Sequence, residues 1–218
     1  MFERTKRNKV LRKPARATAG KDEVYRIVDK ALYCHVAFAS RTASRSSSRQ
    51  HLCRGSDPAA PRLVGQRMIR HGDCNPLCVT MTLIDGIVLA RSAFNHSVNY
   101  RSAILFGNGE AVTNPEAKMD ALERFTERLM PGRWDDIRWP DRKELKATGV
   151  IAMPIESASA KVRTGPPVDD EPDMQLPTWA GVLPLRQLFG APVADPNAPV
   201  DVALPGYLEK YLEARLPS

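Results

Sequence analysis

The sequence has no long apolar run, few cysteines and few histidines, and each shortage excludes a class of protein. Without about 20 consecutive apolar residues, no bilayer-spanning helix is expected. The basic N-terminus lacks the apolar run of a secretory signal, so we expect a cytoplasmic protein with no membrane partner. The four cysteines, Cys34, Cys53, Cys74 and Cys78, form no zinc-binding set with the scattered histidines. The sequence therefore predicts free thiols and no metal site.

The positive charge is concentrated in two segments of the chain. The formal net charge is +7, yet residues 1–21 alone carry eight Lys or Arg against one Glu. Residues 41–66 carry five Arg against one Asp, and the rest of the chain sums to −4. This is not the continuous basic face that binding to a nucleic-acid duplex uses, so no nucleic-acid partner is expected. We interpret residues 1–21 as a basic arm that lies in solvent as a tail.

Hydrophobic periodicity predicts one domain over residues 22–189, mainly β with flanking helices, followed by a C-terminal tail at 190–218. Helices are expected from Asp22 to Leu32, at 115–129 behind an Asn114 cap, and at 141–146. Strands are expected at 33–38, 77–83, 87–90, 100–107, 110–112, 149–155 and 159–163. Tight turns at Asp85-Gly86 and Asn108-Gly109 would join successive strands into a β-meander.

Residues 41–66 interrupt this pattern because they lose nearly all apolar periodicity. Their Ser- and Arg-rich composition predicts a disordered loop. A loop of that length without its own secondary structure is uncommon inside a compact domain. The segment is therefore aberrant for the domain that surrounds it.

The stretch 91–102 gathers hydroxyls, amides, an imidazole and two guanidiniums between predicted strands. Arginine offers a planar fork for phosphate oxygens, which serine hydroxyls complement, so an anionic ligand would explain this density. A loop packed by its own polar groups explains it equally well. Neither Ser92 nor Ser97 lies in a Gly-x-Ser-x-Gly elbow, and His96 has no partner in the sequence that would make a hydrolytic triad.

Two later features each have two interpretations. Lys161 and Arg163 lie on the same face of a predicted strand, where they either meet a phosphate or face water. Trp179 lies among apolar residues and either stacks on a ligand ring or fills the core.

Residues 77–106, 144–148, 159–167 and 179–185 resemble the flavin-nucleotide-binding branch of the pyridoxamine 5′-phosphate oxidase-related proteins, which includes the nitroimidazole-resistance proteins. The resemblance extends from about residue 22 to residue 185. It implies an FMN-binding split β-barrel that forms a homodimer, with flavin mononucleotide (FMN) at the subunit interface. It also implies a flavin-dependent oxidoreductase with a small-molecule substrate that stays unassigned. The chemistry would belong to the flavin, while the protein orients it.

The resemblance also implies cofactor-binding residues. Arg67 and Arg101 would approach the flavin phosphate, and Lys161 and Trp179 would reach across the dimer. The residues expected to line the same pocket are Ser92, Asn99, Tyr100 and Ser102. No catalytic residue is assigned.

Residues 41–66 depart from the family pattern, in which two strands carry a Phe-Val-Ile-Pro-like run and a Leu-Tyr-Leu-His-Gly-Ser-like run before the arginine that matches Arg67. The nucleotide string CGTTCGTCATCCCG, with its last codon filled, encodes Arg-Ser-Ser-Ser-Arg in one frame and Phe-Val-Ile-Pro in another. Residues 45–49 are thus compatible with a frameshifted reading of the expected strand. Resequencing the source gene tests this hypothesis, since an uninterrupted frame that encodes these residues would contradict it.

Two alternative functions stay open. A non-catalytic protein on the same barrel would bind another cofactor, such as deazaflavin or haem, because a shared fold does not fix function. A protein of a different class would bind phosphate polymers or nucleic acid through the basic arm.

Overall fold

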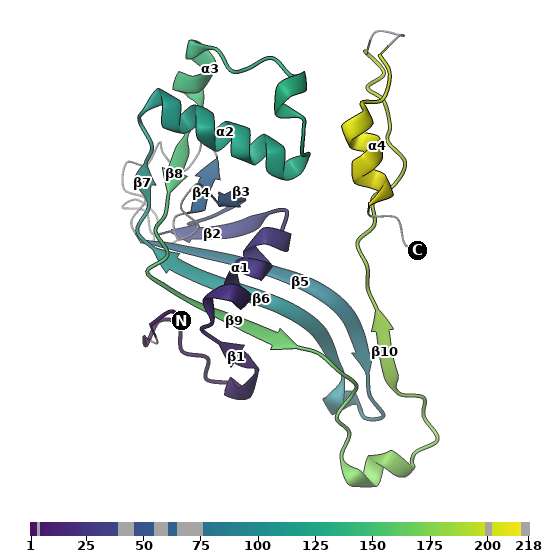
Figure 1. Ribbon diagram of the computed structural model, residues 1–218. Coiled ribbons are helices and arrows are strands. Elements are labelled where there is room, and N and C mark those ends of the chain that lie inside the picture. Colours follow the sequence, from purple (N-terminus) through teal and green to yellow (C-terminus); the bar gives the residue numbers. More distant parts are fainter. Residues whose placement is uncertain (4, 39–45, 55–60, 65–75, 199–201, 215–218) are drawn as a thin grey trace.

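The computed structural model describes residues 1–3, 5–38, 46–54, 61–64, 76–198 and 202–214, with 46–54 and 61–64 described as backbone only (Figure 1). Its main element is a ten-stranded sheet with the order β1-β9-β6-β5-β2-β3-β4-β8-β7, in which β10 also pairs with β5. All of these pairings are antiparallel. The strands are β1 Ala17–Thr18, β2 Cys34–Phe38, β3 Ser46–Arg54, β4 Pro61–Val64, β5 Leu77–Leu89, β6 Ser97–Gly107, β7 Glu110–Ala111, β8 Val150–Ala152, β9 Ser157–Arg163 and β10 Gly181–Pro184.

Three helices flank this sheet (Figure 1), as the sequence predicts: α1 Lys21–Lys30, α2 Pro115–Leu129 and α3 Arg142–Ala147. A further helix, α4 Gly206–Glu213, lies in the C-terminal segment. The Asn114 cap is confirmed, because its Oδ1 accepts a hydrogen bond from the Ala117 amide at 2.9 Å. Within the described ranges, none of the helices is both long and apolar enough to span a bilayer.

The hydrophobic core lies between α1 and one face of the strands β2, β5, β6 and β9. Helix α1 buries Val24, Ile27 and Val28, which recur at helical spacing. The strands contribute alternate residues, among them Met81 of β5 and Leu105 of β6, both 2% exposed or less. The central strands thus have one apolar face and leave a second face for other side chains.

Part of the Ser- and Arg-rich segment forms strands, so the expectation of a loop is wrong for residues 46–54 and 61–64. Strand β3 pairs with β2 and with β4, and β4 pairs with β8. Backbone hydrogen bonds to neighbouring strands need no apolar composition, and tertiary pairing overrides the local preference. The other residues of 41–66 lie outside the described residues, and the frameshift stays a hypothesis.

The predicted turn at Asp85-Gly86 is also wrong, because β5 continues unbroken from Leu77 to Leu89. The register against β6 shifts between Ile84 and Gly86, so the pair marks a bulge. Asp85 instead binds Arg101, with oxygen–nitrogen distances of 2.8 and 2.5 Å. A Cβ on Gly86 would lie 2.9 Å from the Leu183 carbonyl oxygen of β10, so glycine permits this close approach.

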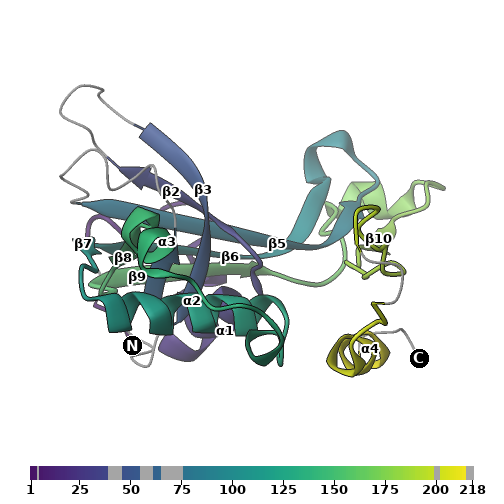
Figure 2. The same ribbon diagram turned by 90° about the horizontal axis from the view of Figure 1, so that it is seen from above.

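The chain beyond β6 does not form the predicted meander. Residues 110–111 form β7, which pairs with β8 rather than folding back on β6. Strand β10 and helix α4 were not predicted. Figure 2 shows β5 and β6 extending past α1 and α2 toward β10. We call this end of the sheet, made of residues 85–99 and 163–184, the distal end.

The N-terminal arm packs on the domain, so the expectation of a tail in solvent is wrong for its anchoring residues. Phe2 is buried in the core and contacts Tyr25 edge-to-face, with ring centroids 6.0 Å apart. Asn8 is also buried, and its side-chain amide donates to the backbone carbonyls of Glu3 and Ala158 at 2.7 and 3.2 Å. The buried Phe2 and Asn8 side chains hold the arm against the edge of β9.

The ion pair of Asp85 and Arg101 predicts a pH-dependent contribution to stability. The hydrogen bond from Arg101 lowers the pKa of Asp85. The pair therefore stabilises the fold above the ordinary carboxyl pKa of about 4, and this contribution is lost as pH falls through the lower folded-state pKa. Both side chains are about one-third exposed, so Asp85→Asn should lower the free energy of unfolding by about 1 kcal/mol at neutral pH.

Urea denaturation at about pH 7 and about pH 3 measures the free energy of unfolding of the wild type and of Asp85→Asn. The difference between the two proteins should be smaller at the lower pH. The matched control is Asp135→Asn, which changes an exposed aspartate and should leave stability unchanged at both values. If Asp85→Asn lowered the free energy of unfolding by the same amount at both pH values, the result would contradict the prediction.

Candidate functional site

The face of the sheet opposite the core carries rows of polar side chains across three strands. Ala103 and Ala160 belong to the core, so their neighbours Ser102 and Lys161 lie on the opposite face. The strand register then aligns three residues in one row, namely Thr82 of β5, Ser102 of β6 and Lys161 of β9. The next row contains Thr80, Ile104 and Ser159. We call this surface the outer face.

The row at Ser102 is organised by its own hydrogen bonds. The Thr82 hydroxyl donates to the Ser102 Oγ at 3.0 Å, and the Ser102 hydroxyl donates to the Met81 carbonyl at 3.1 Å. The Lys161 ammonium brings a positive charge to the same row. The Lys161 ammonium is a donor suited to a phosphate or another anion, and either hydroxyl joins it when its hydrogen turns from the internal acceptor to the ligand.

The predicted cofactor residues divide between the two faces of β6. Tyr100 and Ser102 share the outer face with Lys161, as the register and strand alternation require. Asn99 and Arg101 alternate with them and belong to the opposite side. The stretch 91–102, which the sequence presents as one polar cluster, is therefore divided into separate groups.

Arg101 lies in a cleft of about 910 Å³ between the end of α1, strand β5 and the C-terminal segment. Apolar side chains, including Leu83, Leu188 and Phe189, line the cleft beside Arg101 and Arg128. The carboxylate of Asp85 already occupies two nitrogens of the Arg101 guanidinium. Arg101 is therefore held by an internal partner rather than presented on the outer face.

A second group of arginines lies at the distal end. Arg91 forms an ion pair with Asp169 at 2.9 Å, and the Asp169 side chain is 1% exposed. Arg163 is 4% exposed and donates to Asn99 Oδ1 and to the carbonyls of Gly165 and Pro166. Burial, followed by the nearby charge of Arg16, lowers the pKa of Arg163. These contacts bind the loop after β9 to the start of β6.

Four buried polar atoms at the distal end have no hydrogen-bond partner within the described part of the chain. They are Arg91 Nε, Ser92 Oγ, Asn95 Nδ2 and Arg163 Nε. Unpartnered buried polar atoms are uncommon in folded proteins and require an explanation. Ser92, a predicted cofactor residue, is thus in a group whose hydrogen-bonding capacity is unused.

The other predicted residues have different positions. Trp179 is 68% exposed, and its ring stands over Gly181 at the start of β10, where a Cβ would meet ring atoms at 2.9 Å. Arg67 lies outside the described residues. Trp179 is at the distal end. Its near neighbour Gly181 pairs with Leu89 of β5, whereas the Thr82–Ser102–Lys161 row crosses β5 at Thr82, farther back along the strand.

His96 is oriented by the turn that joins β5 to β6. Its Nδ1 lies 2.8 Å from the Ser92 carbonyl oxygen, so a proton on Nδ1 is held by this contact. The ring is exposed, which leaves Nε2 accessible. No group of three or more His, Cys, Asp or Glu in the described ranges is arranged to hold a metal ion.

The described cysteines are the free thiols that the sequence predicts. Burial raises the pKa of Cys34 to about 12 and also raises the pKa of Cys78. Both groups therefore stay protonated at neutral pH and are poor nucleophiles.

The sequence did not identify Thr82, Ser159 or Asp169 as residues near a site. Strand alternation was the available signal for Thr82 and Ser159, which follow the same period as Ser102 and Lys161. Asp169 had no comparable signal, because its contact with Arg91 joins segments 78 residues apart.

Comparison with solved structures identifies two with substantial sequence identity. The structure titled flavocytochrome Anf3 from Azotobacter vinelandii is 33% identical, with a TM-score of 0.87, and the match covers 94% of this chain and 96% of that one. The FAD and haem binding protein from Mycobacterium smegmatis is 30% identical, with a TM-score of 0.81, over 89% and 96% of the two chains.

A more distant structure shares the fold. It is a candidate 5-nitroimidazole antibiotic resistance protein from Bacteroides thetaiotaomicron, 18% identical with a TM-score of 0.53, and the match covers 67% of this chain and 86% of that one. Among curated proteins, none matches the sequence. Residues 20–162 match the family described as pyridoxamine 5′-phosphate oxidase. The chain therefore belongs to the pyridoxamine 5′-phosphate oxidase family, which confirms the family and the split β-barrel that the sequence resemblance implied.

Proposed function

We propose that this chain is a homodimeric flavoprotein that binds FMN and catalyses a flavin-dependent oxidation or reduction of a small molecule. The observation that carries the proposal is the row of Thr82, Ser102 and Lys161 on the outer face, in a chain of this family. The flavin-binding relatives named above, at 33% and 30% identity, support it.

The residues present fit the phosphate of a flavin. Lys161 supplies a positive charge, and the hydroxyls of Ser102 and Thr82 supply hydrogen-bonding groups in the same row. Tyr100 lies in the neighbouring row of β6, where its ring is available to contact an aromatic ligand. When bound, the flavin supplies the electron transfer, and these side chains bind and orient it.

FMN is the flavin that the family resemblance implies, and flavin adenine dinucleotide (FAD) is the alternative. The relative from Mycobacterium smegmatis is an FAD and haem binding protein, which supports FAD as the alternative ligand. Both flavins contain the same ring and the same first phosphate. The row at Ser102 would therefore bind the first phosphate of FMN or of FAD. Only FAD has a second phosphate, so a site for that group would distinguish the two flavins.

Visible absorption and flavin titration test the proposal. The purified chain, or the chain incubated with FMN, should show flavin absorption. Lys161→Gln combined with Ser102→Ala should weaken FMN binding by at least about tenfold, because charge-assisted hydrogen bonds to the phosphate are lost.

The matched control is Lys143→Gln, which removes the same charge from the exposed helix α3 and should leave FMN affinity unchanged. A chain that binds neither FMN nor FAD would overturn the proposed function. Unchanged affinity in the Lys161 and Ser102 variant would remove the row from the site.

The dimer is supported by the apolar side chains exposed at the distal end. Phe94 is 91% exposed, Leu183 is 58% exposed and Ile87 is 43% exposed. Exposed apolar side chains beside unpartnered buried polar atoms are typical of a surface that another chain covers. In the proposed homodimer, a second copy of this chain covers them.

Sedimentation velocity tests this assembly. Phe94→Glu combined with Leu183→Glu should shift the chain from dimer to monomer, because each substitution places a charge in an apolar interface. Val193→Glu is the matched control, since Val193 is 94% exposed and lies outside the distal end. A wild-type chain that sediments as a monomer would contradict the dimer.

Haem is a second candidate cofactor, favoured by the geometry of His96. The contact between Nδ1 and the Ser92 carbonyl orients the ring and leaves Nε2 accessible, so His96 would hold haem iron through Nε2. The protonated thiols of Cys34 and Cys78 are poor ligands by comparison. The Mycobacterium smegmatis relative is titled as a haem-binding protein.

Titration of the chain with haemin tests this candidate. Binding should shift the Soret band, and His96→Ala should abolish the shift. His35→Ala is the matched control, because His35 is exposed on β2 and contacts Tyr33 instead. An unchanged Soret band in His96→Ala would exclude His96 as the ligand.

A further inference from the structure

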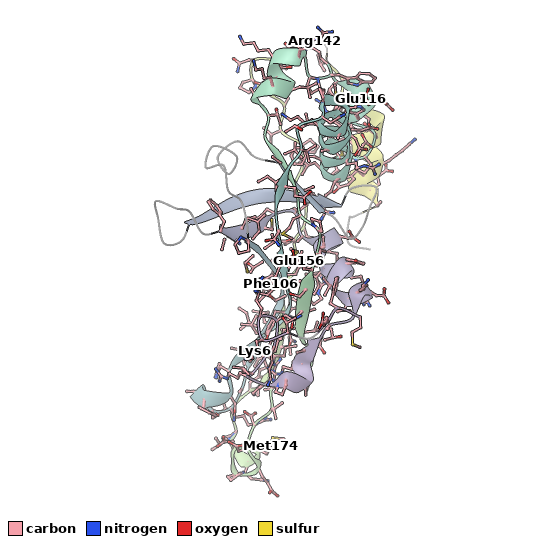
Figure 3. The ribbon with its side chains drawn as sticks, turned by 90° about the vertical axis from the view of Figure 1, so that its left-hand side faces the viewer. Lys6, Phe106, Glu116, Arg142, Glu156 and Met174 are labelled. Carbon is pink, nitrogen blue, oxygen red and sulfur yellow. The ribbon has the colours of Figure 1, made fainter. Side chains whose placement is uncertain are left out.

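A pocket of about 400 Å³ lies between the N-terminal arm and the edge of the sheet. Its lining includes Thr5, Lys6 and Lys9 from the arm, Thr18 from β1 and Ser159 from β9. We call it the arm pocket. Figure 3 shows Lys6 farther along the sheet than Phe106, toward Met174 at the distal end.

The arm pocket opens beside the outer face. Ser159 is on this face, since Ala158 and Ala160 on either side of it belong to the core. The Arg7 guanidinium lies over the Phe106 ring at 5.8 Å from its centroid, which brings the arm to the same side. Lys161 is two residues along β9 from Ser159, a separation of about 7 Å in a strand. The pocket is therefore adjacent to the row at Ser102.

The charges of the arm pocket favour an anion. Both Lys6 and Lys9 are among the lining residues, and none of the lining residues is acidic. Their side chains are exposed at the rim, so they reach a ligand without the cost of burying an unpaired ammonium. Lysine ammonium groups bind phosphate as point charges, so this pair is compatible with a phosphate group.

The hydroxyls of the arm pocket supply donors. Thr5 Oγ1 accepts from the Arg7 amide at 3.3 Å, and Thr18 Oγ1 accepts from the Gly20 amide at 3.0 Å, so each retains its own proton for donation. Ser159 is 8% exposed and lines the pocket from the side of the sheet, so its hydroxyl adds a third hydrogen-bonding group. Three hydroxyls beside two lysines in one pocket are suited to an anion such as phosphate.

We propose that the arm pocket binds a phosphate group through Lys6, Lys9 and the Ser159 hydroxyl. The phosphate has two possible sources. It is the second phosphate of a flavin dinucleotide whose first phosphate lies at Ser102 and Lys161, or it belongs to a separate small phosphorylated ligand. The dinucleotide source rests on the proposed function, whereas a separate phosphorylated ligand does not, because the residues of the arm pocket are distinct from those of the row.

The experiment uses the full chain and three variants. Lys6→Gln combined with Lys9→Gln removes the two charges, and Ser159→Ala removes the buried hydroxyl. Arg142→Gln combined with Lys143→Gln is the matched control, because it removes two charges from the exposed helix α3. Isothermal titration calorimetry measures inorganic pyrophosphate binding, and fluorescence titration measures FMN and FAD binding.

For a dinucleotide, the Lys6 and Lys9 variant should bind FAD at least about tenfold more weakly and leave FMN affinity unchanged. If the phosphate belongs to a separate ligand, the Lys6 and Lys9 variant should bind pyrophosphate more weakly by the same factor, and its affinities for FMN and FAD should be unchanged. Ser159→Ala should lower the affinity for the same probe, FAD or pyrophosphate, by at least about threefold. The α3 control should bind both probes as the wild type does.

Unchanged affinity of the Lys6 and Lys9 variant for both pyrophosphate and FAD would overturn the proposal, as would a wild-type chain that binds neither probe. A chain that binds no flavin but loses pyrophosphate affinity in the variant would retain the arm pocket while the proposed function fails. A chain in which the Lys161 and Ser102 substitutions weaken FMN, but the Lys6 and Lys9 substitutions change nothing, would retain the flavin site alone.

Discussion

The antiparallel register of β5, β6 and β9 is the constraint on which the core and the outer face both depend. Side chains alternate between the two faces, so the register that buries Met81, Leu105 and Ala160 also aligns Ser102 with Lys161. A slip of one residue would exchange the two sets and place a lysine among apolar side chains. The free energy of burying the core therefore also fixes the positions of the polar groups.

The same strands carry two physically different ends. Near the arm, β9 is covered by residues from the start of the chain, and its polar surface is rich in positive charge and hydroxyls. At the distal end, β5 and β6 extend past α1 and α2 and are supported by β10 and by the contact between Arg91 and Asp169. There, large apolar side chains such as Phe94 and Leu183 are exposed, and four buried polar atoms have no partner among the residues that the structure describes. One end thus favours a charged small ligand and the other favours a second chain.

The elements that the sequence predicted well are those specified by neighbouring residues. The Asn114 cap and the apolar spacing from Val24 to Val28 act within a few residues, and both helices form where expected. The Asp85-Gly86 turn failed because distant groups decide this position. Arg101 binds the aspartate, and β10 approaches the glycine from almost 100 residues away in the sequence. Strands β3 and β4 depend on neighbouring backbones in the same way.

The candidate site follows the same division. Strand alternation was sufficient to predict that Ser102 and Lys161 belong together once the register is known. The partner of Arg101, the burial of Arg163 and the arm pocket all need contacts between distant segments, which no local pattern encodes.

The burial of Phe2 and Asn8 has a consequence for how the chain folds during synthesis. Asn8 binds the Ala158 carbonyl across 150 residues of sequence, and Phe2 belongs to the same core as Ala158 and Ala160. Phe2 and Asn8 are synthesised long before β9, so their native contacts cannot form until that strand has emerged. Contacts of such long range close late, and until then Phe2 and the apolar face of α1 are exposed. Completion of the core is thus tied to the emergence of the last central strand.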